Sequence, residues 1–140
     1  AKFEAEQVGI SIEARIKGDF SIVGNQMGLS SCFENIIRNA IRYAKKSVIV
    51  YCHQHNQKGV TIITIQDDGE GVPDEDINHI FDAFYRPELD RSRDSGGVGL
   101  GLSIAQKVVD AHSGKIWAEN IHPNGFAIHI ELPSNFDRLT

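Results

Sequence analysis

The stretch Asp94–Val109, DSGGVGLGLSIAQKVV, joins a glycine-rich loop to the start of an apolar-periodic helix. Leu100, Ile104 and Val108 recur at helical spacing, so the glycines fall at or just before the first turn. Backbone N–H groups and the positive end of the helix dipole would meet there, which favours an anion such as a phosphate. Glycine-rich turns also precede helices that bind nothing, so this motif alone leaves both interpretations open.

Composition limits the classes of protein to which the chain can belong. Its 140 residues fit one domain, and 41% hydrophobic with 24% charged residues is typical of a soluble globular protein. We find neither a signal-peptide pattern nor an apolar run near the roughly 18 residues of a membrane span. The net charge of −5 argues against nucleic-acid binding. Cys32 and Cys52 form no disulfide framework and are expected to be small buried residues in a reduced, cytoplasmic setting.

Hydrophobic periodicity predicts a mixture of strands and helices. Strands are expected at Ile10–Lys17, Phe20–Val23, Val48–His53, Val60–Gln66, Lys115–Glu119 and Gly125–Leu132. A long helix is expected from an N-cap at Asn25 to Ala44, a short helical turn at Asp74–His79, and the glycine-led helix up to His112. Pro87–Gly97 has no periodicity and is interpreted as a mobile lid. This order predicts an α/β fold with a mixed sheet covered by helices on one face.

The long helix carries a polar strip opposite its apolar stripe. At about 100° per residue, Asn35, Asn39 and Arg42 fall within about 60° of one another. Amide oxygens at positions i and i+4 share a face and suit Mg²⁺ bridged by phosphate oxygens. A guanidinium on the same strip would add a cation directed at phosphate. A merely solvated polar face remains the alternative for this strip.

The segment DDGEG ends the fourth predicted strand. Asp67 precedes Gly69 and Gly71, so a carboxylate stands beside backbone that a flat ring could approach. An ionised carboxylate only accepts hydrogen bonds, which suits the exocyclic amino group of adenine. An acidic β-turn at a strand end is the alternative. In order along the chain, the three motifs together make up a complete nucleotide site.

Four motifs of the chain resemble those of a known family. FENIIRNAIRYA looks like the N box, DDGEGV the first G box, IFDAFYR the F box and GGVGLGL the second G box of the sensor histidine kinases. These kinases belong to the superfamily that includes DNA gyrase, Hsp90 and MutL. The resemblance runs from Ile10 to Pro133 and is greatest to the Cpx-type envelope-stress sensors. It implies a two-layer α/β sandwich, the Bergerat fold, with a flexible ATP lid.

The resemblance also implies roles for individual residues. Asn39 would hold Mg²⁺ with Asn35 assisting, and Asp67 would accept from adenine N6. Arg42, Arg86 and Arg91 would neutralise phosphate charge during transfer. Tyr43 would line the ring pocket, which Gly69 and Gly71 would shape. The remaining ATP-binding positions that match the motifs are Val72, Phe84, Gly97, Val98, Gly99, Leu100, Gly101 and Leu102.

The sequence departs from the relatives at two positions. ATP-hydrolysing relatives have a glutamate four residues before the metal-binding Asn, and here that position is Asn35, which cannot act as a base. The site is therefore expected to hold ATP rather than hydrolyse it quickly. The last motif often carries a hydroxyl that helps bind adenine through water. Counting back from Pro133, Ala127 takes that position.

None of the six histidines has the sequence context of a phosphoacceptor. We therefore expect residues 1–8 to be a residual linker from a missing dimerisation domain, and residues 9–140 to be the catalytic ATP-binding domain. The resemblance implies a cytoplasmic domain of a bacterial inner-membrane protein, homodimeric at full length and monomeric when isolated. Its partners would be its own phosphoacceptor domain and a response regulator. The alternatives are an anti-sigma-factor serine kinase of the same fold and a non-catalytic binding module that ATP regulates.

Overall fold

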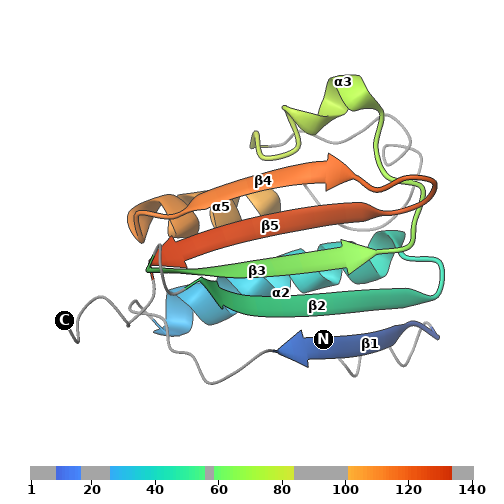
Figure 1. Ribbon diagram of the computed structural model, residues 1–140. Coiled ribbons are helices and arrows are strands. Elements are labelled where there is room, and N and C mark those ends of the chain that lie inside the picture. Colours follow the sequence, from blue (N-terminus) through green and yellow to red (C-terminus); the bar gives the residue numbers. More distant parts are fainter. Residues whose placement is uncertain (1–8, 17–25, 56–58, 84–100, 134–140) are drawn as a thin grey trace.

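The computed structural model describes residues 9–16, 26–55, 59–83 and 101–133. Figure 1 shows five strands side by side, with α2 and α5 both behind the sheet. The predicted mixed sheet with helices on one face is therefore confirmed. The elements are β1 (Ser11–Ile16), α2 (Gln26–Tyr43), β2 (Ser47–His55), β3 (Val60–Asp67), α3 (Asp74–Ile77), α5 (Gly101–Ala111), β4 (Lys115–Asn120) and β5 (Phe126–Pro133).

The strand order is β1-β2-β3-β5-β4. β1 runs parallel to β2, and all other neighbours are antiparallel. Parallel neighbours need a long crossover connection, and α2 lies in the connection between β1 and β2. The last residues of β3 and β4 both pair with Phe126, the first residue of β5. The loops that follow β3 and β4 therefore start at the same end of the strands.

The core lies between the sheet and the two long helices. Alternate residues of β3 are buried, as the period of two predicts. Ile36 of α2 and Val109 of α5 are completely buried and belong to the same core cluster as the buried isoleucines of β3. The Cys32 thiol donates to the Ala105 carbonyl oxygen at 3.7 Å and so joins the two helices. Both cysteines are free and buried, as predicted, and burial raises the pKa of each thiol to about 11.

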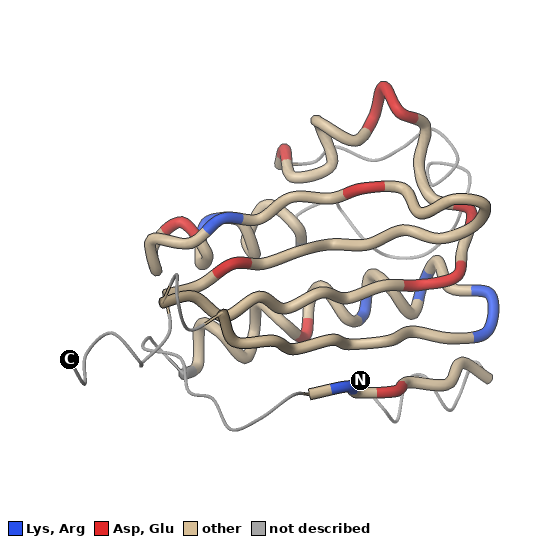
Figure 2. Tube along the Cα trace, viewed as in Figure 1, with Lys and Arg blue, Asp and Glu red and all other residues tan. Residues whose placement is uncertain are grey.

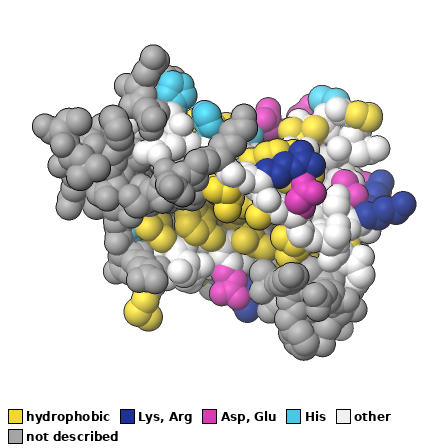
Figure 3. Space-filling view, turned by 60° about the horizontal axis from the view of Figure 1, so that its bottom comes forward, with side chains coloured by type: hydrophobic (Ala, Val, Ile, Leu, Met, Phe, Trp, Pro, Cys, Tyr) yellow, Lys and Arg dark blue, Asp and Glu magenta, His cyan; other side chains and the backbone are white. Residues whose placement is uncertain are grey.

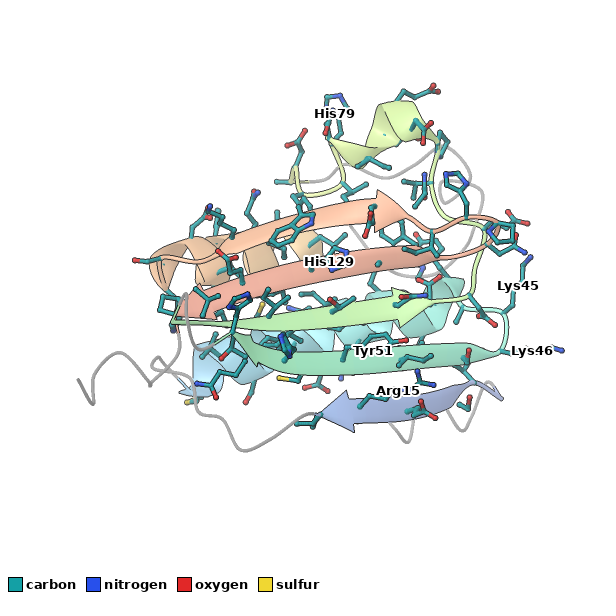
Figure 4. All side chains as sticks on the ribbon, viewed as in Figure 1. Arg15, Lys45, Lys46, Tyr51, His79 and His129 are labelled. Atoms are coloured by element: carbon teal, nitrogen blue, oxygen red, sulfur yellow. The ribbon has the colours of Figure 1, made fainter. Side chains whose placement is uncertain are left out.

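The opposite face of the sheet carries a row of polar and aromatic side chains across all five strands. Strand register aligns Arg15, Tyr51, Thr64, His129 and Trp117. The Arg15 guanidinium lies 5.5 Å from the centre of the Tyr51 ring, and Thr64 Oγ1 is 2.8 Å from His129 Nδ1. Trp117 stacks on the His129 ring at 5.3 Å. Figure 4 shows Arg15, Tyr51 and His129 on the face that the helices leave uncovered.

One apolar side chain of β1 and one at the start of α2 are largely exposed. Figure 3 brings the β1 edge of the sheet forward and shows apolar side chains in a band across its centre. Ile16 is 57% exposed and Met27 is 84% exposed.

The strand predicted at Phe20–Val23 and the N-cap predicted at Asn25 lie outside the described residues. In the described part of the chain, no helix is both long and apolar enough to cross a membrane.

Candidate functional site

The end of β3 carries a buried carboxylate. Asp67 is only 4% exposed, and its Oδ1 accepts a hydrogen bond from the Gly69 N–H at 2.8 Å. Burial raises the pKa of Asp67 to about 6. The Gly69 N–H opposes that rise, and the neighbouring charge of Asp68 adds to it. A buried carboxylate with spare acceptor capacity fits a ligand that offers an N–H donor.

Gly69 packs directly on the last turn of α2. A Cβ built on Gly69 would collide with the Tyr43 backbone oxygen, which glycine alone avoids. The loop after β3 therefore lies against the end of the helix that carries the predicted amide strip. This contact brings Asp67 and Tyr43 to the same region, as the motif order predicted.

Asp68 fastens the same loop to the turn after α2. Its carboxylate accepts the backbone N–H groups of Lys45, Lys46 and Ser47 at 2.8, 3.0 and 3.2 Å. Partial desolvation acts to raise the pKa of Asp68, but these donors hold it below its ordinary value of 3.8. Figure 2 shows the basic turn and the acidic end of β3 at one end of the molecule, where Figure 4 labels Lys45 and Lys46. This role of Asp68 has no local signal in the sequence, because the donors lie more than 20 residues away in the chain.

The loop continues through Gly71 to Val72, where a second side chain holds it. Gly71 has φ +79°, and a Cβ there would collide with Asn120 Oδ1. That oxygen accepts the Val72 N–H at 3.0 Å, and Asn120 Nδ2 donates to the Val72 carbonyl at 2.7 Å. Asn120 was not predicted as a site residue. The sequence offered one indication of this role, the position of a polar amide directly after the predicted strand Lys115–Glu119.

The side chains of Asn35, Asn39 and Arg42 in α2 are half-buried. The sequence placed Asn35, Asn39 and Arg42 opposite the apolar stripe, and in the structure none of the three is fully exposed. The Arg42 guanidinium lies 5.7 Å from the centre of the Tyr43 ring. Glu34, in contrast, is exposed and accepts a hydrogen bond from Arg38 at 3.0 Å. Amides and a guanidinium in partly enclosed surroundings could contact a polyphosphate.

The second glycine motif is described only from its last two residues. Gly101 is the first residue of α5, as predicted, and Leu102 packs against the core. Val72 also packs against the core. Seven predicted site residues lie outside the described residues: Phe84, Arg86, Arg91, Gly97, Val98, Gly99 and Leu100. The predicted lid at Pro87–Gly97 lies outside them as well.

One prediction about the last motif was wrong. Paired residues on neighbouring strands direct their side chains to the same face of a sheet. Asp67 pairs with Phe126, whereas Ala127 pairs with Gln66. Ala127 therefore lies on the opposite face of the sheet from Asp67, not beside it as the motif count implied. Phe126 occupies the position beside the carboxylate.

The described residues fit an adenine nucleotide with a hard cation. Among them, no group of three or more His, Cys, Asp or Glu side chains could hold a metal ion. A divalent ion at this site would depend on amide and phosphate oxygens, which are hard ligands suited to Mg²⁺. The Gly69 N–H lies beside the buried carboxylate, and the Tyr43 backbone oxygen fills the side of Gly69 where a Cβ would stand.

Comparison with known proteins gives a consistent result. A family described as histidine kinase-, DNA gyrase B-, and HSP90-like ATPase matches residues 24–135. The chain is 42% identical over 134 residues to the sensor histidine kinase CpxA of Escherichia coli K12, which covers 95% of this chain. The chain spans only 29% of CpxA's length.

Two solved structures share the fold. The mycobacterial sensor histidine kinase MprB superposes with a TM-score of 0.82 at 28% identity, covering 94% of this chain and 90% of that one. Full-length ShkA in complex with AMPPNP superposes with a TM-score of 0.81 at 23% identity, covering 95% of this chain and 27% of ShkA. At that identity, the second match shows the fold alone.

Proposed function

Because the chain belongs to the family of histidine kinase-, DNA gyrase B- and HSP90-like ATPases, we propose that it is the catalytic domain of a two-component sensor histidine kinase. In this role it binds Mg·ATP and donates the γ-phosphoryl group to a histidine on a separate dimerisation domain. The phosphoryl group then passes to a response regulator. The predicted Bergerat fold is the architecture of the chain's structural relatives.

One observation carries the proposal: the buried carboxylate of Asp67, held by the Gly69 N–H beside the end of α2. Its position suits the exocyclic amino group of adenine, because that group donates and an ionised carboxylate accepts. Gly69 allows the loop to pack against the end of α2, which keeps the carboxylate in this position. The AMPPNP in the ShkA structure is consistent with an adenine nucleotide in this fold.

The phosphates would extend from the base along α2. Asn39 would coordinate Mg²⁺ with help from Asn35, and Arg42 would neutralise phosphate charge. Tyr43 would line the ring pocket. ATP supplies the transferable phosphoryl group, and this chain contributes positioning and charge neutralisation, which account for most of the catalysis of phosphoryl transfer. The roles of Arg86, Arg91, Phe84, Gly97, Val98, Gly99 and Leu100 remain predictions from the motif match.

The site is built to hold ATP rather than to hydrolyse it. Asn35 has no basic group that could take a proton from water. Glu34, the neighbouring carboxylate, lies on the exposed side and pairs with Arg38. One residue along a helix turns a side chain by about 100°, so Glu34 does not share the strip of Asn35 and Asn39. We expect ATP to survive long enough for transfer to an acceptor histidine.

The whole protein is proposed to be a homodimer anchored in a bacterial inner membrane, with this domain in the cytoplasm. Its partners are its own phosphoacceptor domain and a cognate response regulator. The support is the similarity to CpxA, of which this chain matches 29%. The isolated domain is expected to be a monomer.

A phosphotransfer assay tests the proposal. The chain is incubated with γ-labelled ATP, Mg²⁺ and a separate dimerisation domain that carries the acceptor histidine. Label is expected on that domain, and not on a variant in which the acceptor histidine is replaced by glutamine. Asn39→Ala is expected to remove the Mg²⁺ dependence of ATP binding. Label on the serine of an anti-anti-sigma substrate, with none on histidine, would instead establish the anti-sigma-factor kinase.

A further inference from the structure

The buried carboxylate belongs to a row of three residues that crosses β3, β5 and β4 at one end of these strands. Asp67 of β3 pairs with Phe126 of β5, and Phe126 pairs with Asn120 of β4. Paired residues face the same side, so all three side chains lie on the side that the helices cover. Asp67 and Asn120 are two strands apart, or about 10 Å. The loop that follows Asp67 crosses this distance and reaches Asn120 at Val72.

The loop is held at both ends by side chains of this row. Asp67 accepts the Gly69 N–H at 2.8 Å. Asn120 accepts the Val72 N–H at 3.0 Å and donates to the Val72 carbonyl at 2.7 Å. Its amide thus pairs with one residue in both directions, as a neighbouring strand would. Asn120 Nδ2 also lies 3.2 Å from Asp74 Oδ1.

Close packing leaves the loop little freedom between these two ends. Gly69 touches the end of α2, and a Cβ on Gly71 would meet the Asn120 amide. Gly125, next to Phe126, has φ +142°, and a Cβ there would lie 2.8 Å from the Asp67 carbonyl oxygen. A shift of Val72 is therefore transmitted along a short, tightly packed segment to the carboxylate.

We propose that Asn120 is a positioning residue that sets the geometry of the Asp67 loop and thereby the preference for a 6-aminopurine. The inference rests on the proposed function, because it assumes that the loop reads the base. Asn120 acts through Val72 and the loop, not through contact with the ligand. Its loss should weaken recognition of the amino group more than binding of the phosphates.

The role requires an amide, since one end must accept and the other must donate. Asn120→Asp keeps the shape but replaces the donor with a carboxylate oxygen. That oxygen would face the Val72 carbonyl and the Asp74 carboxylate, and both contacts become repulsive. Adding Asp74→Asn removes one of the two repulsions and supplies a donor, so the double variant should recover part of the loss.

The test compares ADP with inosine diphosphate, which carries an oxygen in place of the 6-amino group. Affinities of the 140-residue chain are measured by calorimetry, together with thermal stability. In Asn120→Asp, we expect ADP affinity to fall about tenfold, as for one or two lost hydrogen bonds. Inosine diphosphate affinity should change less than about twofold, so the ratio of the two affinities falls. Asn78→Asp, the same change on an exposed residue after α3, should leave both affinities unchanged.

The affinities of the Asn120 variants for the two nucleotides decide whether this residue positions the loop. Equal losses for the two nucleotides in Asn120→Asp, with a lower melting temperature, would reduce Asn120 to a structural residue and overturn the inference. If Asn120→Asp does not fold, Asn120→Ser, which can make only one of the two Val72 contacts, must show the same falling ratio. A wild-type chain that does not prefer ADP would contradict the proposed function itself, whatever the variants do.

Discussion

The replacement of Asp67 by asparagine should make the domain more stable and a poorer nucleotide binder. Burial raises the pKa of this carboxyl from 3.8 to about 6. A folded-state pKa above the unfolded value means that ionisation opposes folding. The protonated Asp67 carboxyl therefore makes its full contribution to the free energy of unfolding below pH 3.8, and this contribution is lost as the pH rises through about 6. Two pKa units correspond to about 3 kcal/mol, so Asp67→Asn should gain up to about 3 kcal/mol at pH 8.

Urea denaturation of wild type and Asp67→Asn at pH 8 and pH 4.5 measures this difference. An asparagine can still accept the Gly69 N–H, so the variant resembles the protonated wild-type residue. The variant should unfold at higher urea than wild type at pH 8, and the gap should narrow from about 3 to about 1 kcal/mol at pH 4.5. A variant less stable than wild type at pH 8, or a gap that does not depend on pH, would refute the reasoning.

Nucleotide binding should show the opposite pH dependence. The ionised carboxylate is the stronger acceptor for the adenine amino group, so wild-type affinity for ADP should fall by up to about tenfold between pH 7.5 and pH 5, where about one site in eleven is ionised. Asp67→Asn should bind weakly at both pH values. Because phosphate protonation affects both proteins equally, the ratio of their affinities isolates Asp67. A constant ratio would exclude Asp67 as the group that binds the base.

Three further predictions test the loop and the core. Asp68→Ala should lower the free energy of unfolding by about 1–3 kcal/mol in urea, because three backbone N–H groups lose their acceptor. Gly69→Ala should abolish ADP binding in calorimetry, because its Cβ collides with α2. Gly9→Ala, which meets no atom within 4 Å, should leave binding intact and cost only about 1 kcal/mol for its positive φ. Ile36→Ala should destabilise by about 2–5 kcal/mol, whereas Met27→Ala, which is 84% exposed, should stay within about 0.5 kcal/mol.

Much of the fold could be predicted because its signals are local. Alternation in Val60–Gln66 and helical periodicity through Ile36 each arise from one element facing one core, so a single chain segment contains the pattern. The carboxylate of Asp67 was also identified locally, because it stands next to two glycines at a strand end. The fold class and the buried cysteines followed from the same type of evidence.

The positions of side chains that act between distant segments could not be predicted in this way. Asp68 accepts from residues more than 20 positions earlier, and Asn120 holds a residue 48 positions earlier. Ala127 was assigned to the adenine side by counting, but strand register turns it to the opposite face. A shift of one residue in a strand reverses the face of a side chain, and register depends on the partner strand.

The sequence alone thus determined the order of the elements, their buried faces and the motifs that identify the family. The tertiary structure decided which side chains support those motifs. Local periodicity specifies which face of an element is apolar, because that depends only on neighbours in the chain. Hydrogen bonds such as those of Asn120 to Val72 exist only after β4 and the β3 loop have met at one sheet edge.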